Sequence, residues 1–263
     1  MGMKCAKRLV RLFIAGLLLS GCRSAALPSP TPVPIPTSVP PSPTAVPTTP
    51  GLVLYYPFNG DANDMSGNGN NGQVHGATLT ADRFGIPNRA YAFDGVAASI
   101  SFDASKMPVG TSPRTISAWI KAESYPPEAI PGVGSRATVV GWGLDESRQL
   151  SEMQVVNGRL VFHCYGIEPP GSTPLELNQW YHLAIVYNEG PVCLYVNGVQ
   201  NKCQDVPIDT AAGVGRIGAF PDAKTHGFDG SYFHGTIDDI RVCNSALSAA
   251  QIQQLYTEGG WGK

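Results

Sequence analysis

In Tyr55-Tyr-Pro-Phe-Asn-Gly-Asp-Ala-Asn-Asp-Met-Ser-Gly-Asn-Gly-Asn-Asn-Gly72, a short apolar run leads into a loop built almost wholly of Gly, Asn, Asp and Ser. The apolar run extends from Leu52 to Phe58 and is typical of a buried strand. The loop residues accept positive φ angles and hydrogen-bond to their own backbone, so the loop can fold tightly without a helix or a further strand. The stretch therefore predicts the first strand of a β-domain with a compact loop behind it.

The loop also carries a set of side-chain oxygens, at Asn59, Asp61, Asn63, Asp64, Ser66 and Asn68. Ca²⁺ takes about six to eight oxygen ligands, so a loop of this kind can hold the ion. The spacing is not that of an EF-hand, because the glycine falls one place late. A well-capped surface turn explains the same residues and is the simpler interpretation of the loop alone.

The rest of the domain consists of short apolar or alternating runs separated by turn signals. In the run 115–121, Ile116, Ala118 and Ile120 fall on one face and Trp119 on the other. Further strands are predicted near 91–93, 99–102, 137–142, 153–156, 159–165, 180–187, 194–202, 216–220 and 235–242, with Asn157-Gly158 and Asn197-Gly198 as hairpin turns. About a dozen short strands predict an all-β fold of two antiparallel sheets packed as a sandwich.

One helix is predicted, close to the C-terminus. Ser248 and Gln251 form a capping box, and Leu247 and Ile252 are placed as the hydrophobic staple outside it. The helix should end near Glu258, before two glycines, and its apolar face should seal one end of the sandwich.

Residues 1–22 have the features of a signal peptide. A basic start and an apolar core too short to span a bilayer precede Leu19-Ser-Gly-Cys22. These residues resemble the bacterial lipobox, which implies cleavage of the signal and lipidation of Cys22. The resemblance implies a lipid-anchored, extracytoplasmic protein of a bacterial cell envelope, at the outer membrane or the cell surface. An ordinary secretory signal is the alternative.

Residues 23–50 are rich in proline and have little to bury, so they should form an extended polyproline II spacer. At ~3.1 Å per residue, such a spacer reaches on the order of 70 Å, enough to lift a domain off a membrane surface. Residues 51–263 contain no second linker or internal repeat and are predicted to be one domain.

The domain is acidic. Five of the 18 Lys and Arg residues precede residue 51, which leaves 13 against 20 Asp and Glu in residues 51–263. An acidic balance argues against nucleic acid as a partner.

Four cysteines remain in the domain, and an even number in an exported chain predicts two disulfides. Three connectivities are possible, and the preferred one is Cys193–Cys203 with Cys164–Cys243. The Asn197-Gly198 turn would place Cys193 opposite Lys202, so the Cys193–Cys203 bridge requires a bulge or a frayed hairpin end.

Four segments, in this order, resemble the laminin-G-like (concanavalin A-like) jelly-roll domains of bacterial surface and secreted proteins. They are the opening stretch 56–72, Ala90-Tyr-Ala-Phe-Asp-Gly95, the pair Trp180-Tyr-His-Leu-Ala184 and Leu194-Tyr-Val-Asn-Gly198, and the pair Gly235-Thr-Ile-Asp-Asp-Ile-Arg-Val242 and Ala246-Leu-Ser-Ala-Ala-Gln-Ile252. These segments are distributed along the domain, so the resemblance extends over the whole of residues 51–263.

The resemblance implies a jelly roll in which the first and last strands lie side by side. The loop around Asp61 would then approach Asp238 and Asp239, where many such domains hold a structural Ca²⁺. The ligands it implies are Asn59, Asp61, Asp64 and Asp238. Asp239 should point to the opposite face of its strand unless the strand bulges.

The same fold occurs in glycoside hydrolases, but the sequence lacks their paired carboxylates. The Glu-x-Asp-x-x-Glu pattern of laminarinase-like relatives is missing, and Ser151-Glu-Met153 offers a single glutamate.

We therefore expect a non-catalytic binding module, with a glycan as the favoured ligand. Exposed aromatic side chains would form the sugar site, and the candidates are Tyr125, Trp142 and Tyr232. A protein-binding adhesion domain or a structural envelope domain is the alternative, and a glycoside hydrolase is the least favoured.

Overall fold

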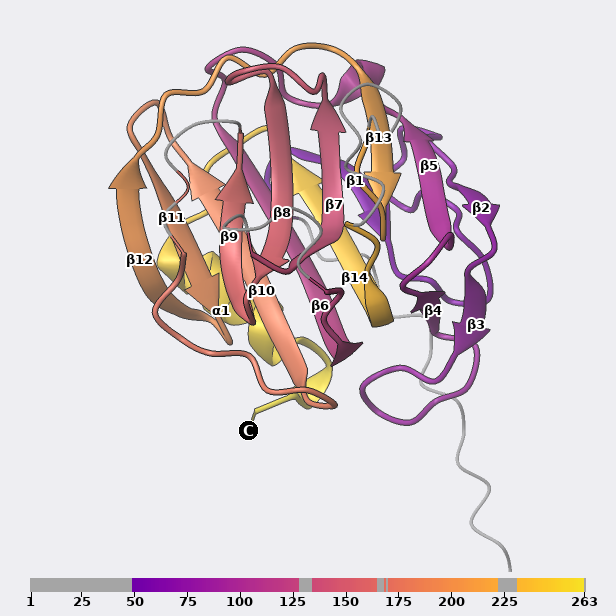
Figure 1. Cartoon of the computed structure of the whole chain (residues 1–263). Coiled ribbons are helices and arrows are strands. Elements are labelled where there is room, and N and C mark those ends of the chain that lie inside the picture. Colours follow the sequence, from indigo (N-terminus) through magenta and orange to yellow (C-terminus); the bar gives the residue numbers. More distant parts are fainter. Residues whose placement is uncertain (1–48, 128–133, 165–167, 169, 222–230, 263) are drawn as a thin grey trace, which may run out of the picture. The chain divides into compact units, whose positions relative to one another are not determined.

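The computed structural model describes residues 49–127, 134–164, 168, 170–221 and 231–262, and within them two antiparallel β-sheets pack face to face (Figure 1). Sheet A contains eight strands: β1 (Leu52–Tyr56), β3 (Thr78–Thr80), β4 (Ala90–Asp94), β6 (Arg114–Ser124), β10 (Trp180–Tyr187), β11 (Pro191–Val196), β12 (Val199–Asp205) and β14 (His234–Cys243). Sheet B contains six: β2 (Gln73–His75), β5 (Ser99–Asp103), β7 (Arg136–Gly143), β8 (Leu150–Val156), β9 (Arg159–His163) and β13 (Val214–Ile217). The prediction of an all-β sandwich is confirmed.

The main core lies between the sheets. Ile116, Ala118 and Ile120 of β6 point into it, as their alternation predicts, and Trp119 is buried on the other face of sheet A. The first and last strands of the sandwich pair directly, with Tyr56 opposite Ile240. β14 therefore lies between β6 on one side and both β1 and β4 on the other.

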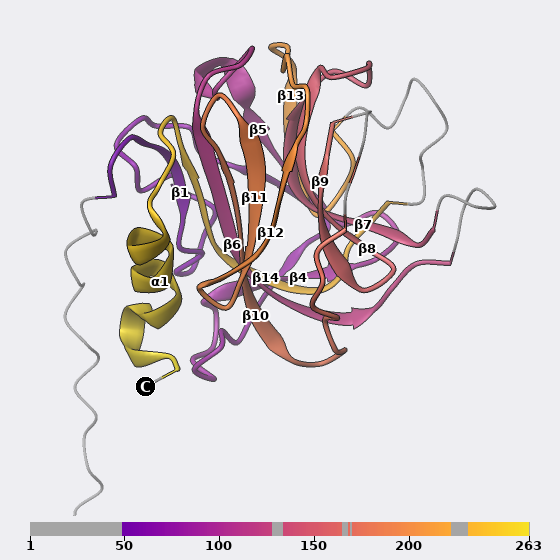
Figure 2. The ribbon, with the colours of Figure 1, turned by 90° about the vertical axis from the view of Figure 1, so that its left-hand side faces the viewer.

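The C-terminal helix α1 (Ala249–Thr257) begins at the predicted capping box, in which Ser248 and Gln251 bond each other's backbone N–H groups. It covers the outer face of sheet A, not an end of the sandwich as expected from the sequence (Figure 2). Ile252 and Leu255 pack there with Ala184, Tyr195 and other small or apolar side chains of the sheet. These side chains form a second hydrophobic cluster, which gives the helix a face to bury.

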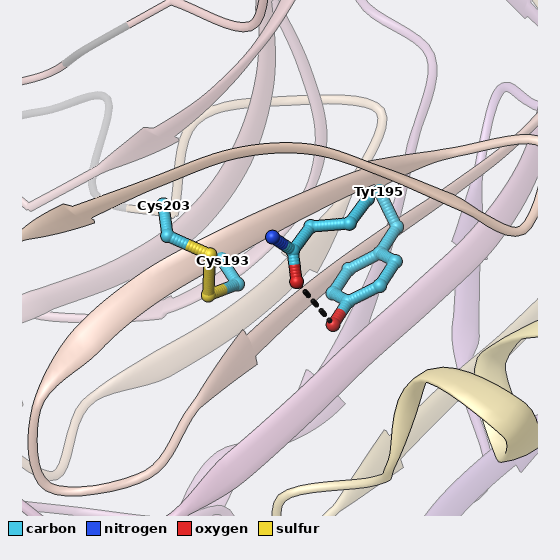
Figure 3. Close-up of a disulfide and its surroundings, with 4 residues drawn as sticks. Cys193, Tyr195 and Cys203 are labelled. Carbon is cyan, nitrogen blue, oxygen red and sulfur yellow. Dashed lines mark hydrogen bonds between the residues drawn. A yellow bond between two sulfur atoms is a disulfide. The ribbon is translucent and has the colours of Figure 1, made fainter.

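Cys193 and Cys203 form a disulfide across β11 and β12 (Figure 3). The register shifts between Leu194 and Tyr195, so β12 has one extra residue, Asn201, and Cys203 lies directly opposite Cys193. This is the bulge that the Cys193–Cys203 pairing requires.

The predicted Cys164–Cys243 disulfide is wrong, because both thiols are free and buried. Cys164 belongs to the core between the sheets, whereas Cys243 lies in the cluster beneath α1 on the outer face of sheet A. The two sulfurs are therefore on opposite sides of a sheet.

The predicted signal peptide 1–22, with Cys22, and the spacer up to residue 48 lie outside the described residues. Within the described residues, no helix has the length and apolar character needed to cross a membrane.

Candidate functional site

The carboxylate of Asp64 holds the Gly/Asn-rich loop together. One oxygen accepts the backbone N–H groups of Tyr55 (3.0 Å) and Ser66 (2.9 Å). The other accepts the Ser66 hydroxyl (2.8 Å) and the N–H of Asn70 (3.0 Å). With four donors already bound, Asp64 does not fit a Ca²⁺ ligand in this conformation, and the capped-turn interpretation describes it well.

Asp238 and Asp239 are both bonded to Arg83, whose Nη1 lies 3.0 Å from Asp238 and 2.7 Å from Asp239. The two carboxylates were expected to point to opposite faces unless the strand bulges. β14 does bulge, where Asp239 takes a φ of 47°, and both carboxylates reach the same guanidinium. Burial and the charge of Asp239 raise the pKa of Asp238. Asp239 is buried too, but Arg241 and Arg83 lower its pKa.

The four expected calcium ligands do not form one site in this conformation. Asp238 faces the guanidinium of Arg83, which repels a cation, while Asn59 and Asp61 are exposed in the loop. Among the described residues, no group of three His, Cys, Asp or Glu side chains is arranged to hold a metal. Calcium binding by the loop stays a prediction.

The three aromatic candidates do not form a stacking surface together. Trp142 is completely buried and donates its indole N–H to the carbonyl oxygen of Pro108 at 3.0 Å, so the prediction that it contacts a ligand is wrong. Tyr125 is half-buried beneath the β8–β9 turn, and its hydroxyl donates to the carbonyl oxygen of Leu175. Tyr232 is half-buried at the entry to β14.

A buried polar cluster lies on the outer face of sheet B, away from the core. Its members alternate with core residues along three adjacent strands: Thr138 on β7, Glu152 and Gln154 on β8, and His163 on β9. Glu152 is completely buried, and adjacent Gly141 makes room for it, because a Cβ there would lie 2.8 Å from the Glu152 Cγ. Such a face normally carries exposed side chains, so a buried set of polar groups is unusual.

His163 is bonded on both sides in this cluster. Its Nδ1 lies 2.8 Å from Glu152, and its Nε2 lies 3.0 Å from Glu168. Burial alone would lower the pKa of His163, but the hydrogen bonds and charges of the two glutamates raise it to about 9. At neutral pH the imidazole is therefore protonated and donates from both nitrogens.

Glu152 accepts the Thr138 hydroxyl (2.6 Å), the Gln154 amide (2.9 Å) and His163, so both of its oxygens are occupied. Glu168 accepts a second hydrogen bond from Arg136 at 3.1 Å. Its burial is outweighed by His163 and Arg136, which together lower the pKa of Glu168.

This cluster borders an open groove of about 360 Å³ at the β8–β9 turn. The groove is lined by Arg136, Val156, Asn157, Arg159, Val161, Glu168 and Pro170. Arg136 is bonded to Gln154 and Glu168 to His163, and both also line the groove, so the hydrogen bonds of the cluster fix polar groups at the wall of the groove. A rigid wall of donors and acceptors suits a polar ligand.

Part of this cluster could have been predicted from the sequence. The two-residue turn Asn157-Gly158 places Glu152 opposite His163 and Gln154 opposite Val161 once the hairpin is accepted. Three polar side chains on one face of a predicted hairpin were the signal. Glu168 gave no comparable signal, because it follows β9 outside any regular element.

A family model described as the concanavalin A-like lectin/glucanases superfamily matches residues 94–253, more than half of the chain. The chain belongs to this superfamily. No curated protein is significantly similar in sequence.

Solved structures of the concanavalin A-like fold resemble the chain at low identity. Domain 4 of AbnA, a GH43 extracellular arabinanase from Geobacillus stearothermophilus solved with arabinotriose, is 20% identical with a TM-score of 0.59, over 78% of this chain and 98% of that domain. The binding domain of Paraclostridial Mosquitocidal Protein 1 is 19% identical with a TM-score of 0.62, over 79% of this chain and 52% of that one. The botulinum neurotoxin serotype G binding domain is 16% identical with a TM-score of 0.59, over 78% and 50%. The chain thus spans about half the length of both toxin domains, and similarity at this level supports the shared fold.

Proposed function

We propose that this chain is a non-catalytic carbohydrate-binding module of a bacterial cell envelope, tethered through a lipidated Cys22. The observation that carries the proposal is the row of hydrogen bonds from buried Glu152 through His163 to Glu168, at the wall of the groove at the β8–β9 turn. It holds Glu168 and its partner Arg136, which line the groove, in fixed positions, and recognition of sugar hydroxyl groups needs polar groups placed in this way. The arabinotriose complex of the AbnA domain supports the proposal at the level of the fold.

The proposal excludes glycoside hydrolysis, because the carboxylates of Glu152 and Glu168 are already engaged by other residues of the protein. A retaining glycosidase needs two carboxyl groups about 5 Å apart that both reach the substrate. Glu152 is completely buried with its oxygens bonded, and Glu168 is neutralised by Arg136 and His163. Neither group is placed to protonate a leaving group or attack a sugar.

A glycan array probed with the full chain, purified in detergent, tests the proposal. We expect binding to a defined set of glycans, and we expect Glu168→Gln to weaken it by about tenfold, because a charge-assisted hydrogen-bond network is broken. Glu189→Gln is the matched control, since Glu189 is exposed in the β10–β11 turn. Absence of binding to every glycan would refute carbohydrate recognition.

A protein ligand is the second candidate. The neurotoxin structures similar to this chain include domains described as receptor-binding. If the array is negative, a pull-down from envelope extracts that is lost in Glu168→Gln and kept in Glu189→Gln would favour this alternative.

A further inference from the structure

The groove at the β8–β9 turn has an excess of positive charge. Its described lining holds two guanidinium groups, Arg136 and Arg159, and one carboxylate, Glu168. Glu168 is already matched by Arg136 and His163. Arg159 has no carboxylate within ion-pair distance among the described residues. Within the part of the chain that the structure describes, one uncompensated guanidinium therefore remains at the groove.

This local charge is opposite to that of the domain as a whole. Residues 51–263 contain 13 Lys and Arg against 20 Asp and Glu, so the net charge of the domain repels anions. An anionic group is attracted to a cation that has no ion-pair partner, and Arg159 is such a cation among the described residues.

Arg159 is held in position by the segment 170–175, called the strap here. Its Nη1 donates to the carbonyl oxygens of Ser172 and, at 3.5 Å, Gly171. No protein partner is found within the described residues for its other guanidinium N–H groups, and the side chain is partly exposed. The contacts thus fix the guanidinium and leave donors available to a ligand.

The strap is anchored to both sheets. The N–H of Gly171 donates to the carbonyl oxygen of Leu160 on β9 at 2.8 Å. On the other side, the bulge residue Asn201 of β12 accepts from the N–H of Ser172 at 2.6 Å and donates to the Thr173 hydroxyl at 2.5 Å. Because the bulge brings Cys203 opposite Cys193, the disulfide secures the strand that holds this anchor.

A second cation reaches the same strap. Lys202, next to Asn201, places its Nζ 3.4 Å from the carbonyl oxygen of Pro170, which lines the groove. This contact is exposed, and Lys202 forms no ion pair among the described residues. Arg159 from sheet B and Lys202 from sheet A therefore both lie against the strap.

We infer that the groove takes an acidic polysaccharide and that Arg159 contacts its carboxylate or sulfate group. The inference rests on the proposed carbohydrate function and names the ligand class. A guanidinium offers paired N–H donors that match the two oxygens of such an anion, and a fixed guanidinium loses little freedom on binding. Lys202 adds a point charge beside it.

Titration of the full chain with four polymers tests the inference: dextran, dextran sulfate, polygalacturonate and poly-glutamate. The first is a neutral polysaccharide, the next two carry sulfate or carboxylate on a sugar chain, and the last is a polyanion without sugar. We expect dextran sulfate, polygalacturonate or both to bind at least tenfold more tightly than dextran and poly-glutamate. The preference between dextran sulfate and polygalacturonate shows whether the site favours a sulfate or a carboxylate.

The variants assign the contact to Arg159. Arg159→Gln should weaken binding of the preferred polymer by about tenfold or more, and Arg159→Lys should restore only part of it, because an ammonium lacks the fork. Arg89→Gln is the control, with the same charge change on sheet A near β4. Lys202→Gln should have a smaller effect than Arg159→Gln. Thermal melting checks that each variant is folded.

Each other result overturns a specific statement. Equal losses in Arg159→Gln and Arg89→Gln refute the role of Arg159. Dextran binding as tightly as the acidic polysaccharides refutes the ligand class and leaves the proposed function standing. Poly-glutamate binding that is as tight, and equally sensitive to Arg159→Gln, supports an anion site but refutes the ligand class, because the sugar chain then contributes nothing to recognition. Failure of all four polymers to bind refutes the inference, and the glycan array then decides the proposed function separately.

Discussion

Asp238 and Asp239 are neighbours in the sequence, yet both carboxylates lie on the outer face of sheet A, where they share one nitrogen of Arg83. The bulge in β14 makes this possible, and Ile237 and Ile240 on either side still point into the core. The guanidinium of Arg83 also lies 4.7 Å from the ring centre of Trp119. The pair therefore joins the last strand to the segment before β4 through a buried charge cluster.

The first prediction concerns this cluster. Arg83→Met should lower the free energy of unfolding by about 3–5 kcal/mol, because it leaves the buried carboxylate of Asp238 without its ion-pair partner, whereas Asp239 keeps Arg241. Arg89→Met should change it by less than about 0.5 kcal/mol, since Arg89 forms no ion pair among the described residues. Urea unfolding of both variants is the measurement. Similar losses in the two variants would show that Arg83 does not hold the cluster together.

The second prediction concerns stability at acidic pH. Burial, with Arg241 and Arg83 nearby, lowers the pKa of His182 from its usual 6.5 to about 3. As the pH falls, the imidazole of His182 is therefore protonated in the unfolded chain before it is protonated in the folded protein. The stability that the neutral, buried His182 contributes is present above pH 6.5 and is lost as the pH falls toward 3. His182→Phe should flatten the stability curve in that window, by at most about 1.4 kcal/mol per pH unit. Parallel curves for the variant and the natural chain would contradict the burial of a neutral imidazole.

The third prediction has the opposite sign. The pKa of His163 is raised to about 9 by Glu152 and Glu168, against the effect of burial. Its contribution to stability is complete below pH 6.5 and is lost as the pH rises through 9. Unfolding curves for His163→Gln and the natural chain should therefore converge between pH 6.5 and 9. A constant gap across that window would exclude a protonated His163.

The fourth prediction concerns the cysteines. Peptide mapping of the unreduced, denatured protein should find Cys193 linked to Cys203, and Cys164 and Cys243 open to alkylation. The bridge closes a loop with a sequence separation of 10, for which chain entropy gives a stabilisation of about 2.7 kcal/mol. Replacing Cys193 and Cys203 together by Ser should lower stability by about this amount, and a Cys164–Cys243 linked peptide would contradict the structure.

The fifth prediction concerns Ca²⁺ binding by the Gly/Asn-rich loop that contains Asp61. If the loop binds Ca²⁺, a hundredfold excess over Kd should stabilise the native protein by about 2.7 kcal/mol, and Mg²⁺ should do less. Asp61→Asn should remove that gain, whereas Asp238→Asn should lower the melting midpoint equally with and without Ca²⁺, because Asp238 neutralises Arg83. Identical melting of metal-free protein with and without Ca²⁺ would rule out the loop as a site.

The anchor can be tested in cells. Because Cys22 closes a lipobox-like stretch ahead of a long spacer, Cys22→Ser should move the protein from the membrane fraction to the soluble fraction. A variant that stays with the membrane would show that something other than a lipid on Cys22 holds the protein there.

The sequence by itself determined the features that local patterns encode. Alternation of apolar residues predicted the strands and the inward face of β6, and the capping box predicted the start of α1. The Asn197-Gly198 turn showed that a Cys193–Cys203 bridge needs a bulge, and the bulge is present at Asn201. These features depend on residues close together in the chain, so the chain alone carries the information.

Only the tertiary structure decided which faces are covered and where the strands break register. Helix α1 lies over Trp119 on the outer face of sheet A, and the bulge in β14 turns Asp239 to the side of Asp238. Glu168 reaches His163 from outside any strand. Strand alternation assumes an unbroken ladder, and it carries no information about what packs on each face. Bulges and covering segments are selected by contacts between residues far apart in the chain, and those contacts exist only in the folded molecule.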